Sequence, residues 1–197
     1  ANGERGALDL LVAPEFASSG NFYVYYSAAP STRLRIMQYT LRSTGAETLA
    51  SAQLLWENPG PAHSSFGQFH IGGSLTIGPD NHFYLTVGDG LSSSNSQLKT
   101  NVFGKVLRIA RNGSVPAGNP FADGTGTNID EIWALGLRNT FRASWDLASA
   151  SKSAVLSRAA ASSWKLRESE LRRWWCASVE GARRAFSSAS SRSAAAT

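Results

Sequence analysis

The chain has 197 residues, 42% of them hydrophobic, and a formal net charge of +5 at pH 7. The positive charge belongs to the C-terminal part, because residues 1–150 hold 10 Lys and Arg against 11 Asp and Glu, whereas residues 151–197 hold 9 against 3. These values argue against a nucleic-acid-binding main segment, against a transmembrane helix, since no apolar run reaches 18 residues, and against an intramolecular disulfide, since Cys176 is the single cysteine.

The first part of the chain predicts four short strands separated by turns. Apolar and aromatic residues dominate residues 8–12 and 22–27, and a proline-containing turn at residues 13–20 separates them. Two further strands are expected at residues 33–41 and 53–57. Four short antiparallel strands in succession are typical of one blade of a β-propeller.

A β-hairpin is expected next, with strands at residues 74–78 and 82–87. The segment between them is rich in Gly, Pro, Asp and Asn, which favour a tight turn. His70 precedes the first strand and Asp89 follows the second. Because these two ends lie side by side in an antiparallel pair, we expect an imidazole and a carboxylate to meet at one end of a sheet. Neighbouring glycines would let another molecule approach the backbone closely.

The order of strand, proline-containing turn and aromatic strand recurs at an offset of about 65 residues. Residues 75–87 repeat residues 10–26, and a strand expected at 104–110 repeats 33–41. A third copy begins with a strand expected at residues 141–145. The repeat predicts an all-β fold, a partial β-propeller of about two to three blades.

The third copy stops after Asp146, where the composition changes abruptly. From residue 151 onward there are 12 Ser and 11 Ala. We therefore expect a propeller domain at residues 1–146 and a non-homologous Ser/Ala/Arg-rich tail at residues 147–197 that is disordered or loosely helical. Residues 163–175 are compatible with a basic amphipathic helix that binds a membrane or a partner. The preferred interpretation is a non-native tail, such as the product of a reading-frame slip.

Five motifs in order resemble the soluble quinoprotein sugar dehydrogenases, the glucose/sorbosone and aldose-sugar dehydrogenases that use pyrroloquinoline quinone. The hairpin supplies His-x-Gly-Gly before its first strand, Gly-Pro-Asp in its turn and Gly-Asp-Gly after its second strand. The other motifs are residues 3–6 with 13–16, residues 104–109, and residues 119–121 followed by residues 131–139, which together are the most specific match. The resemblance extends from about residue 3 to residue 146.

The resemblance implies a six-bladed propeller, of which this chain is a fragment of roughly the first half. It also implies pyrroloquinoline quinone and calcium as cofactors, a sugar as substrate, an external electron acceptor, and a periplasmic or secreted protein. The family's calcium-binding loop and the basic residues of its later blades are not matched in this chain, so no residue is assigned to a metal. We expect the chain alone to be incomplete and inactive.

The resemblance assigns roles to five residues of this sequence. His70 is the general base that takes the proton of a sugar hydroxyl while hydride leaves for the quinone. Arg138 is expected to bind the anionic cofactor and stabilise charge on it, and Asn139 lines the same site. Glu4 and Asp89 are placed on the cofactor side. Simpler structural roles stay open: a packed histidine, an arginine that ties a loop, and an aspartate that caps a turn.

Other candidate groups are read as structural. His63 and His82 are expected at the surface. Residues 123–130 look calcium-like but lack the spacing of an EF-hand, so a plain loop is preferred. Residues 112–114 form a glycosylation sequon that reads more simply as a turn.

The sequence also departs from the family at several positions. Ile71 stands where many members have Asn, and Thr140 stands where the family usually has Pro. Phe69 stands where the glucose enzymes carry an acid, and Gly90 replaces a glutamine that those enzymes use on the sugar. These changes leave the identity of the substrate undetermined. They are also consistent with an alternative function, that of a non-catalytic extracellular propeller that binds a partner, as in proteins resembling hedgehog-interacting protein.

Overall fold

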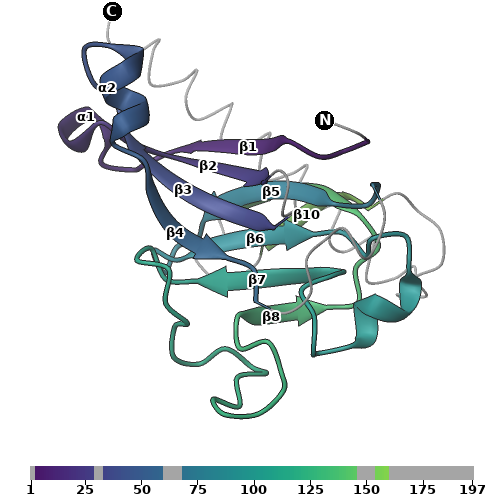
Figure 1. Cartoon of the computed structure of the whole chain (residues 1–197). Helices are drawn as coiled ribbons and strands as arrows, with labels where there is room; N and C mark the ends of the chain where they lie inside the picture. The colour runs from purple at the N-terminus through teal and green to yellow at the C-terminus, as the bar shows by residue number, and fades with distance from the viewer. Residues whose placement is uncertain (1–2, 29–32, 60–67, 146–153, 160–197) are drawn as a thin grey trace, which may run out of the picture. The chain divides into compact units, whose positions relative to one another are not determined.

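The structure is a computed structural model that describes residues 3–28, 33–59, 68–145 and 154–159. The chain divides into two compact units, and all described residues belong to the unit formed by Ala1–Trp145 and Ala154–Ala160. Two four-stranded antiparallel sheets make up most of this unit (Figure 1). Among the described residues, no helix is long and apolar enough to cross a membrane.

The first sheet has the order β1-β2-β3-β4. Its strands are β1 (Ala7–Val12), β2 (Asn21–Ser27), β3 (Leu34–Thr40) and β4 (Gln53–Glu57). Alternate residues of β2 are buried, as the period of a half-buried strand requires. All four strands were expected from the sequence, with ends that differ by no more than two residues.

The second sheet has the order β5-β6-β7-β8. Its strands are β5 (Gly72–Ile77), β6 (Phe83–Val87), β7 (Lys105–Ile109) and β8 (Ile132–Leu135). Every residue of β6 is buried, which shows that this strand lies in the interior of the sheet. Two consecutive sheets of four meandering strands confirm the all-β class and the partial propeller, each sheet being one blade.

Three short helical segments were not predicted. They are α1 (Phe16–Ser19), α2 (Gly45–Ala50) and the 3₁₀ turn η2 (Ser93–Gln97). The helix α2 begins with a capping box, in which the Thr44 hydroxyl accepts from Glu47 N and the Glu47 carboxylate accepts from Thr44 N. All three segments connect strands and leave the predicted order of strands unchanged.

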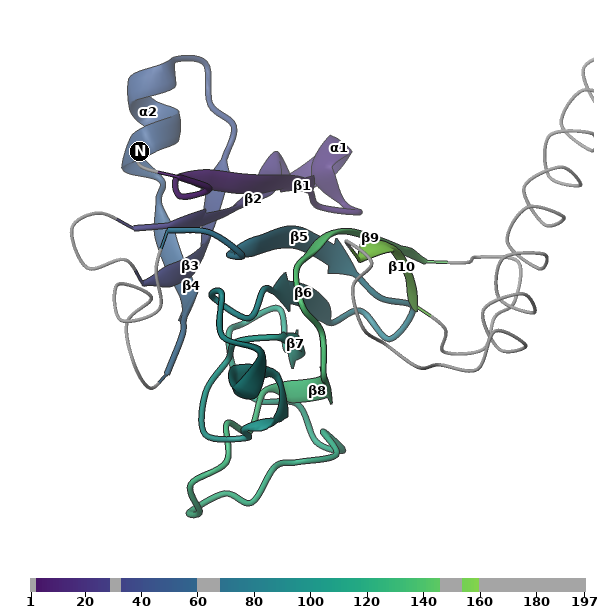
Figure 2. The same ribbon diagram turned by 90° about the vertical axis from the view of Figure 1, so that its right-hand side faces the viewer.

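A third, two-stranded sheet pairs β9 (Thr140–Trp145) with β10 (Ala154–Ala159) in antiparallel register. Figure 2 shows these strands beside β5. Two hydrogen bonds join β9 to β5: Ala143 N donates to the Ser74 hydroxyl, and the Trp145 indole donates to the Thr76 hydroxyl. The strand β10 lies within the segment after residue 146 that was expected to be disordered or loosely helical, and it pairs with β9 along its length. The backbone edge of β9 that β10 occupies is one with which a neighbouring extended segment can pair. Residues 146–153 and 160–197 lie outside the described residues, so the domain boundary at residue 146 stays a prediction.

The two larger sheets pack on each other through directed polar bonds and a shared apolar core. Leu75 N of β5 donates to Asp9 Oδ2 of β1 at 2.8 Å. The Trp56 indole of β4 donates to the buried carboxylate of Glu131 at 3.0 Å. Across the same boundary, the ring of Tyr23 contacts the ring of Phe83 edge to face. The largest fully buried hydrophobic side chains are Tyr23, Tyr25, Leu34, Ile36, Ile71, Phe83, Leu85, Phe103, Leu107, Ile109 and Ile132.

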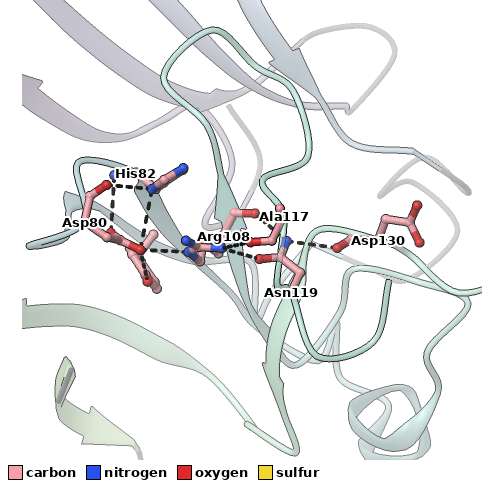
Figure 3. A network of polar contacts seen from close by, with 7 residues as sticks. Asp80, His82, Arg108, Ala117, Asn119 and Asp130 are labelled. Carbon is pink, nitrogen blue, oxygen red and sulfur yellow. Dashed lines mark hydrogen bonds and ion pairs between the residues drawn. The ribbon is translucent and has the colours of Figure 1, made fainter. Parts of the chain in front are cut away.

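A polar network fixes the turn of the β5–β6 hairpin (Figure 3). Asp80 Oδ2 accepts from Arg108 Nε at 2.8 Å and from the Tyr84 hydroxyl at 2.9 Å. Arg108 also donates to Asn119 Oδ1 at 3.0 Å, and the Asn119 amide donates to the carbonyl of Asp130 at 2.9 Å. Partial burial opposes ionisation of Asp80, but the hydrogen bonds from Arg108 and Tyr84 prevail and lower its pKa. The network holds one end of the hairpin and leaves the other end for the residues described next.

Candidate active site

The imidazole of His70 and the carboxylate of Asp89 meet at the open end of the β5–β6 hairpin. Gly72 pairs with Val87 in the register of the two strands, so the residues two positions beyond each of them face one another. His70 Nδ1 lies 2.8 Å from Asp89 Oδ1, and the two side chains are 14% and 3% exposed. When the carboxylate accepts from Nδ1–H, the neutral ring keeps an unprotonated Nε2 that can accept a proton.

Asp89 is held in place by bonds to its backbone as well as to its side chain. Its carboxylate also accepts from Leu91 N at 3.0 Å, its carbonyl accepts from the Asn95 amide at 3.0 Å, and its N–H donates to the carbonyl of Arg138 at 2.6 Å. Asp89 therefore caps a turn, which is the structural role left open for it from the sequence, and it orients the imidazole at the same time.

His70 adopts a left-handed backbone conformation, with φ of 59°. Such a conformation costs a non-glycine residue about 1–2 kcal/mol, so neighbouring contacts must hold it. The carbonyl of His70 accepts from Gly90 N at 3.1 Å, and the next N–H in the chain, that of Ile71, donates to Glu4 Oε2 at 3.1 Å. The strained residue is thus fixed on both sides by the predicted site segments.

Asn139 lies against the same strand ends. Its Oδ1 accepts from Gly72 N at 3.1 Å, and the side chain is almost fully buried. A Cβ placed on Gly88 would lie 2.1 Å from the carbonyl oxygen of His70 and 2.6 Å from Asn139 Oδ1. The close packing of His70 and Asn139 therefore requires a glycine at this position.

Arg138 is brought to the site through its backbone, which accepts the hydrogen bond from Asp89 N. Its side chain is half-buried. The guanidinium makes no hydrogen bond or ion pair with any other residue in the part of the chain that the structure describes. All five residues assigned from the sequence, Glu4, His70, Asp89, Arg138 and Asn139, are therefore linked around one end of the second sheet.

Two residues that support this site were not predicted. Asn95 is buried in η2 and bonds to Asp89 as described. Lys105 is 0% exposed, and burial lowers the pKa of its amine to about 8. The sequence signal for both was weak, because a serine-rich loop and a lysine at a strand end normally read as solvated.

The remaining candidates have structural surroundings. Asp130 Oδ1 accepts from the N–H groups of Asp123 and Gly124 at 2.8 and 3.3 Å, so this loop uses a carboxylate to cap itself. His82 is half-buried with Nδ1 2.7 Å from the carbonyl of Asp80, whereas His63 lies outside the described residues. Among the residues that are described, no three His, Cys, Asp or Glu side chains gather as a metal site.

A family model described as "Glucose / Sorbosone dehydrogenase" matches residues 1–151. The aldose sugar dehydrogenase YliI of Escherichia coli is 26% identical over 141 residues, which cover 71% of this chain and 37% of that protein. The hedgehog-interacting protein of Homo sapiens is 27% identical over 164 residues, which cover 73% of this chain and 23% of that protein. The chain thus spans less than half the length of these relatives.

The fold also resembles that of a solved sugar dehydrogenase structure. The aldose sugar dehydrogenase of Streptomyces coelicolor, in the form bound to pyrroloquinoline quinone, superposes with a TM-score of 0.61 at 28% sequence identity. The match covers 75% of this chain and 41% of that one. The family-model match over residues 1–151 includes both four-stranded sheets and the hairpin that carries the paired imidazole and carboxylate.

Proposed function

Because the chain belongs to the glucose/sorbosone dehydrogenase family, we propose that it is part of an enzyme that oxidises a hydroxyl of an aldose or related sugar with pyrroloquinoline quinone. The observation that carries the proposal is the His70–Asp89 pair, in which Asp89 binds Nδ1 and leaves Nε2 for the substrate. A buried carboxylate that holds a histidine in one tautomer is the usual arrangement for a general base.

In the proposed reaction, His70 Nε2 accepts the proton of the sugar hydroxyl. The C–H bond of the same carbon breaks as hydride, so that the C–O bond becomes a carbonyl. The quinone, when bound, supplies the two-electron acceptor. Asp89 stabilises the imidazolium that forms on His70, and the hydrogen bond between Asp89 and Nδ1 fixes the direction of the ring.

The residues at this end of the sheet fit an anionic quinone. The half-buried guanidinium of Arg138 has no partner among the described residues, so it is available to a carboxylate or to an oxygen that gains negative charge. Glu4 Oε2 and Asn139 Oδ1 each accept a backbone N–H, so we propose that these two residues shape the wall of the cofactor site. Further cationic partners are expected from later blades. Calcium is retained from the family resemblance alone, without assigned ligands.

The test uses a protein completed from the same gene, with the reading frame continued after Asp146. It is loaded with pyrroloquinoline quinone and calcium, and dye reduction is measured with glucose and other aldoses. His70→Ala should abolish turnover while cofactor binding stays nearly intact, because the base acts on the substrate proton. Unchanged turnover in His70→Ala would remove His70 as the base. Residues 1–197 alone are expected to show no turnover.

A non-catalytic extracellular binding propeller is the second candidate. It is supported by the similarity to hedgehog-interacting protein and by Gly90, which stands where the glucose enzymes carry a sugar-binding glutamine. A completed, folded protein that binds no quinone and reduces no dye with any aldose would favour this candidate. The proposed location is periplasmic or secreted for either function, and the proposed enzyme would pass electrons to an external acceptor.

A further inference from the structure

Lys105 is the first residue of β7 and is completely buried. Its Nζ donates to the carbonyls of Asn95 at 2.8 Å, Ser96 at 3.2 Å and Phe103. An ammonium group has three donors, and each of them has an acceptor here. Lysine is seldom fully buried without a carboxylate partner, and within the described residues Lys105 makes no ion pair. The role of this buried ammonium must therefore be sought in the three carbonyl groups to which it donates.

The backbone of Lys105 lies between the two strands that lead to the candidate site. In the central strand β7, Lys105 pairs with Val87 of β6 on one side and with Leu135 of β8 on the other. Asp89 follows Val87 by two residues, and Arg138 follows Leu135 by three. Lys105 thus lies next to both segments that deliver site residues.

The loop bound by the ammonium is tied to the same two segments. The side chain of Asn95 donates to the carbonyl of Asp89 at 3.0 Å. The hydroxyl of Ser96 donates to the carbonyl of Leu137 at 2.7 Å, and the Ser96 carbonyl accepts from Gly136 N at 2.9 Å. Asn95 and Ser96 therefore bridge the segment after β6 and the segment after β8, and the ammonium fixes their carbonyls.

We propose that Lys105 is a positioning residue of the candidate site: through Asn95 and Ser96 it holds Asp89 and the Arg138 segment in place around His70. Lys105 is not a catalytic residue, because its amine is buried and all of its donors are used. Its importance for catalysis rests on the proposed function, whereas its effect on the His70–Asp89 pair does not.

The test measures the His70–Asp89 hydrogen bond directly, by proton NMR of the whole 197-residue chain. An Nδ1–H held by a carboxylate gives a downfield signal when its exchange with water is slow. The chain has three histidines, and the signal is assigned by its disappearance in His70→Gln and Asp89→Asn. Neither substrate nor cofactor is needed, so failure of the proposed oxidation and failure of this inference give different results.

In Lys105→Met, we expect the signal to broaden or disappear, with exchange faster by roughly tenfold, the effect of losing one hydrogen bond of ordinary strength. The matched control is Lys99→Met, because the Lys99 ammonium lies over the Phe121 ring, 5.0 Å from its centre, and within the described part of the chain it makes no hydrogen bond or ion pair with a site residue. Lys105→Cys in a Cys176→Ser background, aminoethylated before refolding, restores an amine at nearly the same distance and should restore the signal.

An unchanged signal in a folded Lys105→Met chain would overturn the proposal, and so would the absence of the signal from the unmodified chain. If Lys105→Met does not fold, Asn95→Ala decides. It keeps the lysine and cuts only the bond from the loop to Asp89. A sharp, slowly exchanging signal in Asn95→Ala would show that the loop does not position Asp89.

Discussion

His70 Nδ1 lies 2.8 Å from Asp89 Oδ1, across 19 positions of sequence. The distance follows from a strand register in which Gly72 faces Val87, whereas the Asp80–Arg108 network holds the turn at the far end of the hairpin. The register sets the geometry of the pair, so changes at the two ends of the hairpin are expected to have separable effects.

Asp89→Asn is expected to reduce kcat of the completed enzyme by roughly 10²–10⁴, because an amide no longer stabilises the imidazolium or holds the productive tautomer. KM should change much less. Steady-state dye reduction measures both constants. The control is Asp80→Asn, the same substitution at the opposite end of the hairpin, which should lower stability and leave kcat unchanged. Equal losses of kcat in the two variants would contradict the assignment.

Gly88→Ala is expected to destabilise the fold strongly, by roughly 3 kcal/mol or more, because backbone atoms must move to admit the methyl group. A Cβ at this position would lie 2.1 Å from the carbonyl oxygen of His70. The matched control is Gly45→Ala, where a Cβ meets nothing within 4 Å. Urea unfolding of both variants measures the difference, and similar stabilities would refute the crowding argument.

Thr140→Val is expected to be neutral or stabilising by up to about 1 kcal/mol, since the Thr140 hydroxyl is buried without a hydrogen-bond partner among the described residues. Thr86→Val is the contrasting variant. The Thr86 hydroxyl donates to the Thr140 carbonyl at 2.9 Å and accepts from Ser74 N at 3.0 Å. Its loss should cost about 1–3 kcal/mol. Thermal or urea unfolding measures both stabilities. A Thr86→Val variant more stable than Thr140→Val would contradict the prediction.

Lys105 predicts an alkaline dependence of stability. Burial lowers its pKa in the folded chain to about 8, against 10.5 for an ordinary lysine. Between these two pH values the unfolded chain binds more protons, so the free energy of unfolding should rise with pH by a few kcal/mol at most. The destabilising contribution is fully present below pH 8. Comparison with Lys105→Met cancels other alkaline titrations, and a difference that falls with rising pH would contradict the prediction.

The strands and the His70–Asp89 pair could be predicted from the sequence because both depend on local rules. Alternating apolar residues and a proline-containing turn define the hairpin, and antiparallel geometry then brings its two ends together. The short strand β8 was missed because its four residues are all apolar, so the sequence shows no alternation of apolar and polar residues there. The capping box at Thr44 and Glu47 was a readable helix signal that the strand pattern obscured.

The supporting residues could not be predicted because their role depends on three-dimensional surroundings. A lysine at the start of a strand normally faces solvent, and only the fold shows that Lys105 points at three carbonyls. The strand β10 was missed for a similar reason. The serine- and alanine-rich composition of residues 151–197 does not favour a strand, and β10 pairs along the edge of β9.

The hydrogen bond from Trp56 to Glu131 joins two residues that are 75 positions apart, at the boundary between the first and second sheets. Proteins built from similar repeats can misassemble when one repeat takes the place of another during folding. A buried carboxylate without its indole partner is costly, so a repeat docked in the wrong place leaves Glu131 unsatisfied. We therefore expect this bond to favour docking of the first sheet against the second over docking against another repeat.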